Sequence, residues 1–245
     1  MDNALLVSLS QQLAAYRSMD VIANNLANLS TPAFKREAVK FEQFVQQVRP
    51  SEDQSGPQTL SFVQDTGVVR DLSEGRLETT GAPYDLAING KGYFVVQTAA
   101  GDRYTRNGHL TLNGDGQLIT DSGDAIQGDG GPITITADDG DIHVASDGTV
   151  SGKQGQIGKL RVVDFANERT LQKEGDSLYS TAQSPTTMAN AKIMQGTLET
   201  SNVEPVIEIS HMIDVMRAYQ ATTTLSQSED DLKRQAIDKL GSTPD

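Results

Sequence analysis

The tetrapeptide Gly-Asp-Ser-Leu at 175–178 is the stretch that most directly suggests chemistry. A serine in such a motif can act as the nucleophile of an esterase if a histidine base, oriented by a carboxylate, lies beside it. Glu208 and His211 follow downstream at the required spacing, but both fall within a helical pattern. The residues before the motif are polar, whereas an esterase nucleophile follows a buried strand. A Gly-Asp turn that leads into a strand is the favoured interpretation, and an esterase is the distant alternative.

The acidic, glycine-rich turns between residues 113 and 141 raise the question of calcium binding. A helix–loop–helix calcium loop needs oxygen ligands at positions 1, 3, 5 and 12 with glycine at position 6, and no window meets this pattern. The glycines at 90–92 and 155–158 do not form a complete phosphate-binding loop. His109 and His143 are isolated. We therefore expect ordinary β-turns, with no catalytic residue, metal or cofactor.

Composition narrows the possible partners. The 245 residues carry a net charge of −13, which repels phosphate backbones and disfavours nucleic-acid binding. There is no cysteine, so disulfides and thiolate chemistry are excluded. Only 36% of residues are hydrophobic, which suggests that part of the chain depends on partners for its core. We expect no transmembrane segment and no cleaved signal peptide, since the apolar runs are short and Asp2 stands where a signal needs positive charge.

Glycine divides the chain into zones. None of the 22 glycines lies in residues 1–55, whereas seventeen lie in residues 75–158. Glycine is costly in helices and favoured in turns, so the first zone can be helical. Residues 3–29 are predicted as one amphipathic helix that ends before Pro32. Its apolar stripe comprises Leu6, Leu9, Leu13, Tyr16, Met19, Ile22, Leu26 and Leu29.

A second amphipathic helix is predicted over residues 203–240. Pro205 suits its first turn, and Gly241 suits its end. At ~1.5 Å per residue this helix is about 55 Å long, which is typical of a coiled coil. Its stripe comprises Ile209, Met212, Ile213, Met216 and Tyr219, continued by Leu225, Leu232, Ala236 and Leu240.

The middle of the chain is predicted to be a mainly antiparallel β domain. In residues 109–120, apolar alternation on both sides of Asn-Gly-Asp-Gly is typical of a hairpin. The fold class is thus α+β, with long terminal helices flanking an all-β domain. Residues 41–48 could form a short helix or a strand, and residues 49–58 are expected to be a mobile loop. The predicted domains are an N-terminal helix at 1–35, an extended or mobile linker at 36–75, the β domain at 76–190 and a C-terminal helical region at 191–245.

The two stripes could pair within one chain or bundle with helices of other chains. The length of the helices and the low content of hydrophobic residues favour bundling between chains. Asn24, Asn25 and Asn28 end the first helix, where asparagine is a poor helix former, and buried amides can fix register in a bundle. Thr31 and Pro32 are expected to turn the chain away from the helix. The predicted interface comprises Leu6, Leu9, Leu13, Ile22, Asn24, Asn25, Leu26, Asn28, Ile209, Ile213, Met216, Tyr219 and Leu225.

Three stretches in order resemble the axial proteins of the bacterial flagellum, the rod and hook family: residues 19–35, residues 75–96 followed by 103–120, and residues 196–220. The resemblance implies a non-enzymatic structural subunit of the basal-body rod that transmits torque. It implies partners that are copies of itself, other rod proteins and the flagellar type III export apparatus. The short length disfavours hook proteins, and the first three residues with the tail from Val203 favour a proximal-rod over a distal-rod member. An adhesin or periplasmic binding module that uses the β domain is a further alternative.

Ala33 departs from the family pattern. The family usually has glycine after Thr-Pro or a similar pair, and here alanine occupies that position. If the position requires a positive φ, an alanine there is strained, because its Cβ clashes with the backbone. The local turn is therefore expected to differ slightly from the family pattern.

Overall fold

The computed structural model describes residues 2–48 and 58–241, which divide into two compact units. Unit 1 contains both long helices and a β-hairpin, and unit 2 contains residues 28–36 and 72–203. The mobile loop predicted for residues 49–58 lies outside the described residues except for Gln58. The predicted helix–β–helix order is confirmed.

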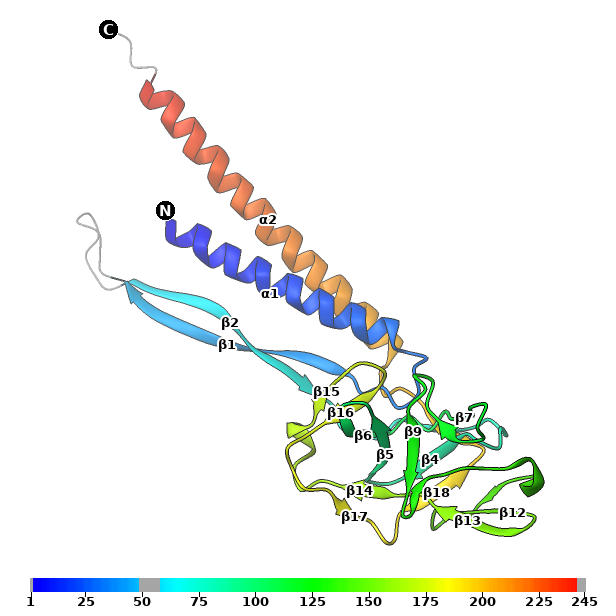
Figure 1. Ribbon diagram of the computed structural model, residues 1–245. Coiled ribbons are helices and arrows are strands. Elements are labelled where there is room, and N and C mark those ends of the chain that lie inside the picture. Colours follow the sequence, from blue (N-terminus) through cyan, green and yellow to red (C-terminus); the bar gives the residue numbers. More distant parts are fainter. Residues whose placement is uncertain (1, 49–57, 242–245) are drawn as a thin grey trace. The chain divides into compact units, whose positions relative to one another are not determined.

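Unit 1 is built from helix α1 (Asp2–Ala27), strands β1 (Glu37–Val48) and β2 (Gln58–Arg70), and helix α2 (Pro205–Gly241). The two helices lie side by side and run in opposite directions, and α2 extends past the N-terminus of α1 (Figure 1). β1 and β2 form an antiparallel ribbon that also contacts α1. The region predicted as a linker at 36–75 is thus mainly a long hairpin, and residues 41–48 are strand.

A β-bulge interrupts the hairpin. The register shifts between Lys40 and Phe41, so that Thr66 has no opposite residue. The Thr66 hydroxyl donates to the Lys40 carbonyl at 2.9 Å, and Gly67 adopts a φ of 117°. An extra residue with a glycine at positive φ bends and twists a ribbon locally, which accounts for the curvature of this long hairpin.

Unit 2 is a β domain in which every described strand pairing is antiparallel. Its strands are β3 (Leu77–Thr79), β4 (Leu86–Asn89), β5 (Tyr93–Thr98), β6 (Gly101–Thr105), β7 (Thr111–Leu112), β8 (Leu118–Ile119), β9 (Ala125–Gly128), β10 (Gly131–Pro132), β11 (His143–Val144), β12 (Thr149–Gly152), β13 (Gly155–Lys159), β14 (Val162–Asp164), β15 (Gln172–Lys173), β16 (Leu178–Ser180), β17 (Thr186–Thr187), β18 (Lys192–Gln195) and β19 (Thr197–Glu199). The main sheet runs β15-β16-β6-β5-β9-β8-β7. The predicted hairpin at 109–120 is present as β7 and β8.

β5 lies at the centre of unit 2 and is buried on both faces. Because successive side chains of a strand point to opposite faces, Phe94 and Val96 enter the large aliphatic core, whereas Tyr93 and Val95 enter a smaller cluster. That smaller cluster is aromatic: the rings of Tyr104 and Phe165 meet edge to face with centroids 4.7 Å apart. Two cores on one strand give unit 2 a rigid centre.

The C-terminal helical region predicted at 191–245 begins with strand rather than helix. β18 pairs with β4, and β19 pairs with β3, so residues 192–199 complete the β domain. α2 then begins at Pro205, where a missing backbone N–H costs nothing in the first turn. The residues that precede α2 are therefore fixed by sheet pairing within unit 2.

Candidate assembly surface

The predicted stripe of α1 divides into an exposed part and a buried part. Leu6, Leu9 and Leu13 are 48–63% exposed. At about 100° per residue these leucines share one face of the helix, and the buried Ser8 and Ile22 lie on a different face. In the first turns of α1, the small polar Ser8 is therefore buried within the chain, whereas the leucines face solvent.

α2 repeats this arrangement. Ile209, Ile213 and Met216 are 44–49% exposed and share one face. The buried face is about a quarter turn away and follows Glu208, Met212, Val215 and Tyr219 at alternating spacings of four and three. Leu225, further along α2, is also exposed. Each helix thus leaves an apolar strip uncovered, whereas Ile22, Leu26 and Tyr219 are wholly or partly covered within the chain.

The three asparagines at the end of α1 have different environments. Asn24 is exposed, Asn28 is half-buried, and Asn25 has no exposed surface. The Asn25 amide binds both backbone groups of Glu37: Nδ2 donates to the carbonyl at 2.8 Å, and Oδ1 accepts from the N–H at 3.0 Å. Nδ2 also donates to Glu208 Oε2 at 3.0 Å. Asn25 therefore joins α1, the start of β1 and α2 inside unit 1.

A tight turn follows the helix in unit 2. The Phe34 N–H donates to the Thr31 carbonyl at 3.3 Å, with Pro32 second and Ala33 third in the turn. Ala33 has a φ of 56°, as the third residue of a type II turn requires, and glycine is the usual residue there. The condition under which the sequence predicted a strained alanine, a positive φ at this position, is therefore met. The conformation is held by burial and by a 2.7 Å hydrogen bond from the Ala33 N–H to the Glu199 carbonyl.

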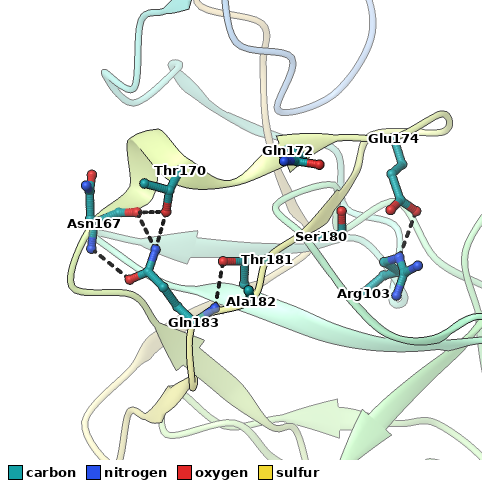
Figure 2. A pocket seen from close by; sticks show the side chains of 9 residues that line it. All are labelled: Arg103, Asn167, Thr170, Gln172, Glu174, Ser180, Thr181, Ala182 and Gln183. Carbon is teal, nitrogen blue, oxygen red and sulfur yellow. Dashed lines mark hydrogen bonds and ion pairs between the residues drawn. The ribbon is translucent and has the colours of Figure 1, made fainter.

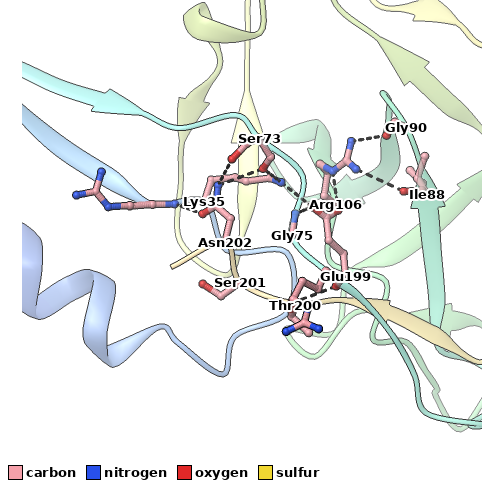
Figure 3. Close-up of polar contacts among 12 residues, drawn as sticks. Lys35, Ser73, Gly75, Ile88, Gly90, Arg106, Glu199, Thr200, Ser201 and Asn202 are labelled. Carbon is pink, nitrogen blue, oxygen red and sulfur yellow. Dashed lines mark hydrogen bonds and ion pairs between the residues drawn. The ribbon is translucent and has the colours of Figure 1, made fainter. Parts of the chain in front are cut away.

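Glu199 lies at the centre of a buried ion cluster (Figure 3). Its Oε1 accepts from Lys35 Nζ at 2.6 Å and from the Gly75 N–H at 2.9 Å. Its Oε2 accepts from Arg106 Nε at 2.8 Å. The Arg106 guanidinium also donates to the carbonyls of Gly90 and Gly92. One carboxylate therefore joins three chain segments that are distant in sequence.

The electrostatics of this cluster follow from burial and charge. Burial alone would raise the pKa of the Glu199 carboxyl, but the charges of Arg106 and Lys35 and their hydrogen bonds outweigh it and lower the pKa below its usual value of 4.5. Burial lowers the pKa of the Lys35 ammonium below 10.5, with Arg106 acting in the same direction, although Glu199 opposes the shift. Each charge is tolerable only because its partners are in place.

Asn202 and Ser73 extend the cluster. The Arg36 N–H donates to Asn202 Oδ1 at 2.6 Å, and Asn202 Nδ2 donates to the Ser73 carbonyl at 3.1 Å. Lys35 Nζ donates to the same carbonyl at 2.7 Å. A Cβ on Gly75 would lie 1.8 Å from the Thr200 carbonyl oxygen, so only glycine permits this approach. The segments at 31–36, 72–76 and 199–202 are thus packed together within unit 2.

The Gly-Asp-Ser-Leu motif forms a turn. Asp176 and Ser177 both have a φ of 58°, and the Leu178 N–H donates to the Gly175 carbonyl at 3.1 Å, which is the pattern of a type I′ hairpin turn. The turn joins β15 to β16, as the non-catalytic interpretation predicted. The nucleophile geometry after a buried strand is not found here.

A polar hollow of about 840 Å³ lies beside this hairpin (Figure 2). Arg103 Nε donates to Glu174 Oε2 at 2.7 Å on one side, and the Gln183 amide donates to the Asn167 carbonyl at 2.9 Å and also contacts Thr170 on the other. These side chains bond one another, and we assign no ligand to the hollow. Within the described ranges, no cluster of three acidic or histidine side chains could hold a metal, and no helix is long and apolar enough to cross a membrane.

The sequence did not single out Lys35, Arg106 or Glu199. Each lies in a stretch that carries the family resemblance, but nothing local marks these charges as buried. Lys35 and Glu199 are 164 residues apart in the chain, and Arg106 and Glu199 are 93 apart. Only an alignment of related sequences, or the fold itself, could signal their pairing.

Three family models match the chain. They are described as flagella basal body rod protein (residues 5–35), flagellar hook protein FlgE/F/G D1 domain (87–152) and flagellar basal body rod FlgEFG protein C-terminal (194–239). The chain is 41% identical to the flagellar basal-body rod protein FlgF of Caulobacter vibrioides, covering 98% of the chain and 99% of that protein. It is 32% identical to FlgF of Mesorhizobium japonicum, with 99% of each covered. It is 32% identical to the rod protein FlgG of Bacillus subtilis, with 89% and 92% covered.

Proposed function

Since the chain belongs to the family of flagellar basal-body rod and hook proteins that includes FlgE, FlgF and FlgG, we propose that it is a structural subunit of the flagellar rod. The relatives are named as rod proteins and not as enzymes, and we assign it no catalytic role. Its place is the flagellar basal body, where it assembles with copies of itself and with other rod proteins through its terminal helices.

The exposed apolar strips carry this proposal. Leu6, Leu9 and Leu13 on α1, and Ile209, Ile213 and Met216 on α2, stay exposed although both helices already pack within unit 1. Full burial of a leucine, isoleucine or methionine side chain contributes about 1.5–3 kcal/mol of stability. The part of this free energy that the six half-exposed side chains do not gain within their own chain is available for association. Packing against helices of neighbouring subunits would recover it in coiled-coil fashion. Asn24, exposed at the end of α1, is proposed to contact a neighbour, whereas Asn25 acts within its own chain.

The finer assignment is to the proximal rod, as a FlgF-type subunit. Near full-length similarity to two FlgF proteins supports this assignment, and similarity to FlgG keeps a distal-rod subunit as the alternative. In either position, bundled helices would give the rod the stiffness needed to transmit torque from motor to hook. We further propose export through the flagellar type III apparatus without cleavage of a signal.

Exposed apolar strips are a liability in a free subunit. We propose that the helices are incompletely folded in the free protein and become ordered on assembly, which would also provide a narrow chain for export. Hydrogen exchange of the free protein and of assembled rods tests this idea. Strong protection of residues 6–27 and 206–240 in dilute free protein would contradict it.

The assembly proposal is tested by placing charges on the strips. Leu9→Asp and Ile213→Asp are expected to abolish rod formation and swimming in a strain that lacks its own copy, because a carboxylate cannot be buried in an apolar contact. Gln11→Asp and Ala218→Asp are matched controls, since both residues are exposed on the same helices but lie off the strips. Normal rods with Leu9→Asp and Ile213→Asp would refute the proposed surface, as would failure of the controls.

A binding module that acts through its β domain is the competing function. Under that reading the terminal helices are dispensable, and deletion of α2 should leave activity intact. Under the rod proposal, deletion of either helix abolishes assembly. Electron microscopy of basal bodies that carry a tagged copy distinguishes the proximal from the distal rod.

A further inference from the structure

The Glu199 cluster has a feature that the assembly proposal does not use: Ala33, Phe34 and Lys35, in the segment that follows α1, bond to residues of unit 2. The Ala33 N–H donates to the Glu199 carbonyl at 2.7 Å, and the Asn202 N–H donates to the Phe34 carbonyl at 3.2 Å. Lys35 Nζ donates to Glu199 Oε1 at 2.6 Å. None of these contacts involves a residue of α1.

The segment is also fixed by apolar contact. Phe34 is buried, and Lys173 Nζ of β15 lies 4.2 Å from the centre of its ring, within cation–π range. Ala33 is buried in the turn beside it. Residues 31–36 therefore have both a hydrophobic anchor and polar anchors on the β domain.

The charge balance identifies the part played by Lys35. Arg106 alone neutralises Glu199, and that pair is also bonded to backbone groups of Gly75, Gly90 and Gly92. Lys35 is a second cation that the β strands do not need for neutrality. Burial of the Lys35 ammonium costs free energy. This cost is offset only when the segment that carries Lys35 is docked on Glu199. The pairing therefore ties the segment to the domain and is not required for the domain's own neutrality.

We propose that Glu199 acts as a latch that keeps residues 31–36 docked on unit 2 whether or not α1 is folded. The latch would fix the chain that follows the C-terminal end of α1. A fixed end reduces the chain entropy lost when the helix finds its partners. This inference concerns the single chain, so it can fail without affecting the proposed role in the rod, and the reverse also holds.

The experiment uses the full-length chain and hydrogen exchange read by mass spectrometry. Two prolines, Ala14→Pro and Ser18→Pro, break α1 in its central turns. The expected result is that residues 6–27 are unprotected, whereas the amides of Ala33 and Arg36 stay protected. Loss of protection at Ala33 and Arg36 together with α1 would overturn the latch.

A second set of variants tests whether Lys35 carries the docking. In the proline background, Lys35→Met is expected to speed exchange at Ala33 and Arg36 by about tenfold or more, since a charged hydrogen bond is lost. Lys35→Arg keeps the charge and should restore much of the protection. Lys91→Met is the matched control, because Lys91 is exposed on the same unit and should change nothing.

Amides of β5 report whether unit 2 is intact. They should keep their protection in Lys35→Met, because the Arg106–Glu199 pair remains balanced. Unchanged exchange at Ala33 and Arg36 would overturn the proposal. Loss of β5 protection in Lys35→Met would also overturn it, because the lysine would then be needed for the whole domain and not for the segment alone.

Discussion

Replacement of Glu199 by glutamine provides the sharpest test of how unit 2 is held together. Glu199→Gln keeps the size and shape of the side chain but removes its negative charge. Lys35 and Arg106 then remain buried with no anion between them, at side-chain exposures of 4% and 6%. The amide also presents a donor to at least one cation, where an acceptor is needed.

The size of the effect follows from these contacts. Removal of one partner from a buried ion pair costs about 3–5 kcal/mol, because a charge is left buried without compensation. Here two cations are left, so the upper part of that range applies. For a domain of this size each kcal/mol lowers Tm by about 2–4 °C, so we expect a fall of about 10 °C or more. Lys35→Met should cost much less, because it leaves a neutral Arg106–Glu199 pair.

Near-UV circular dichroism is a suitable assay, because four of the six tyrosines lie in unit 2 and there is no tryptophan. Melting curves of the wild type, Glu199→Gln and Lys35→Met would be compared. Glu42→Gln is the control, since Glu42 pairs with Lys40 on the surface, where ion pairs contribute little. If the free energy of unfolding of Glu199→Gln lies within about 1 kcal/mol of the wild-type value, the reasoning is refuted. If Lys35→Met lowers Tm as much as Glu199→Gln does, the charge argument is refuted.

Four further predictions concern the pH dependence of the Glu199 cluster and three other sites. Because the pKa of Glu199 is lowered on folding, its stabilising contribution is present above its usual value of 4.5 and is lost as pH falls through the lowered folded value; melting curves from pH 6 to 3 should therefore show a decline that is weaker in Glu199→Gln. Ala33→Gly should keep stability within about 1 kcal/mol, as relief of Cβ strain offsets lost burial and added chain entropy, whereas Ala33→Val should cost more than about 2 kcal/mol in urea unfolding. Asn25→Ala should destabilise unit 1 by about 2 kcal/mol or more, measured by helical circular dichroism, because it removes the hydrogen bonds that the Asn25 amide makes to Glu37 and Glu208. Ser177→Gly should raise stability by about 0.5–1 kcal/mol, since glycine suits the positive φ of the hairpin turn, and a loss of stability would contradict the turn assignment.

Local pattern was enough to predict the helices and most strands. The apolar spacing over residues 6–26 and 209–225 identified α1 and α2, and Pro32 and Pro205 marked the end of one and the start of the other. The hairpin at 109–120 was equally clear, because its alternation and its Asn-Gly-Asp-Gly turn are adjacent in the chain. The region at 36–75 was harder to interpret, because the pairing of β1 with β2 depends on contacts between residues as far apart as Glu37 and Arg70, which local composition does not encode.

Sequence reasoning alone established that the chain has two amphipathic helices around a β domain, and that Ala33 stands where the family usually has glycine. Helical and strand periodicities are local properties, and a family resemblance is carried by short ordered motifs. The fold was needed to establish which face of each helix is covered, since Asn25 rather than Asn24 is buried and the leucines of α1 remain exposed. Only the structure brought Lys35, Arg106 and Glu199 together. Burial of a charge depends on partners far away in the chain, and no local pattern reveals where those partners lie.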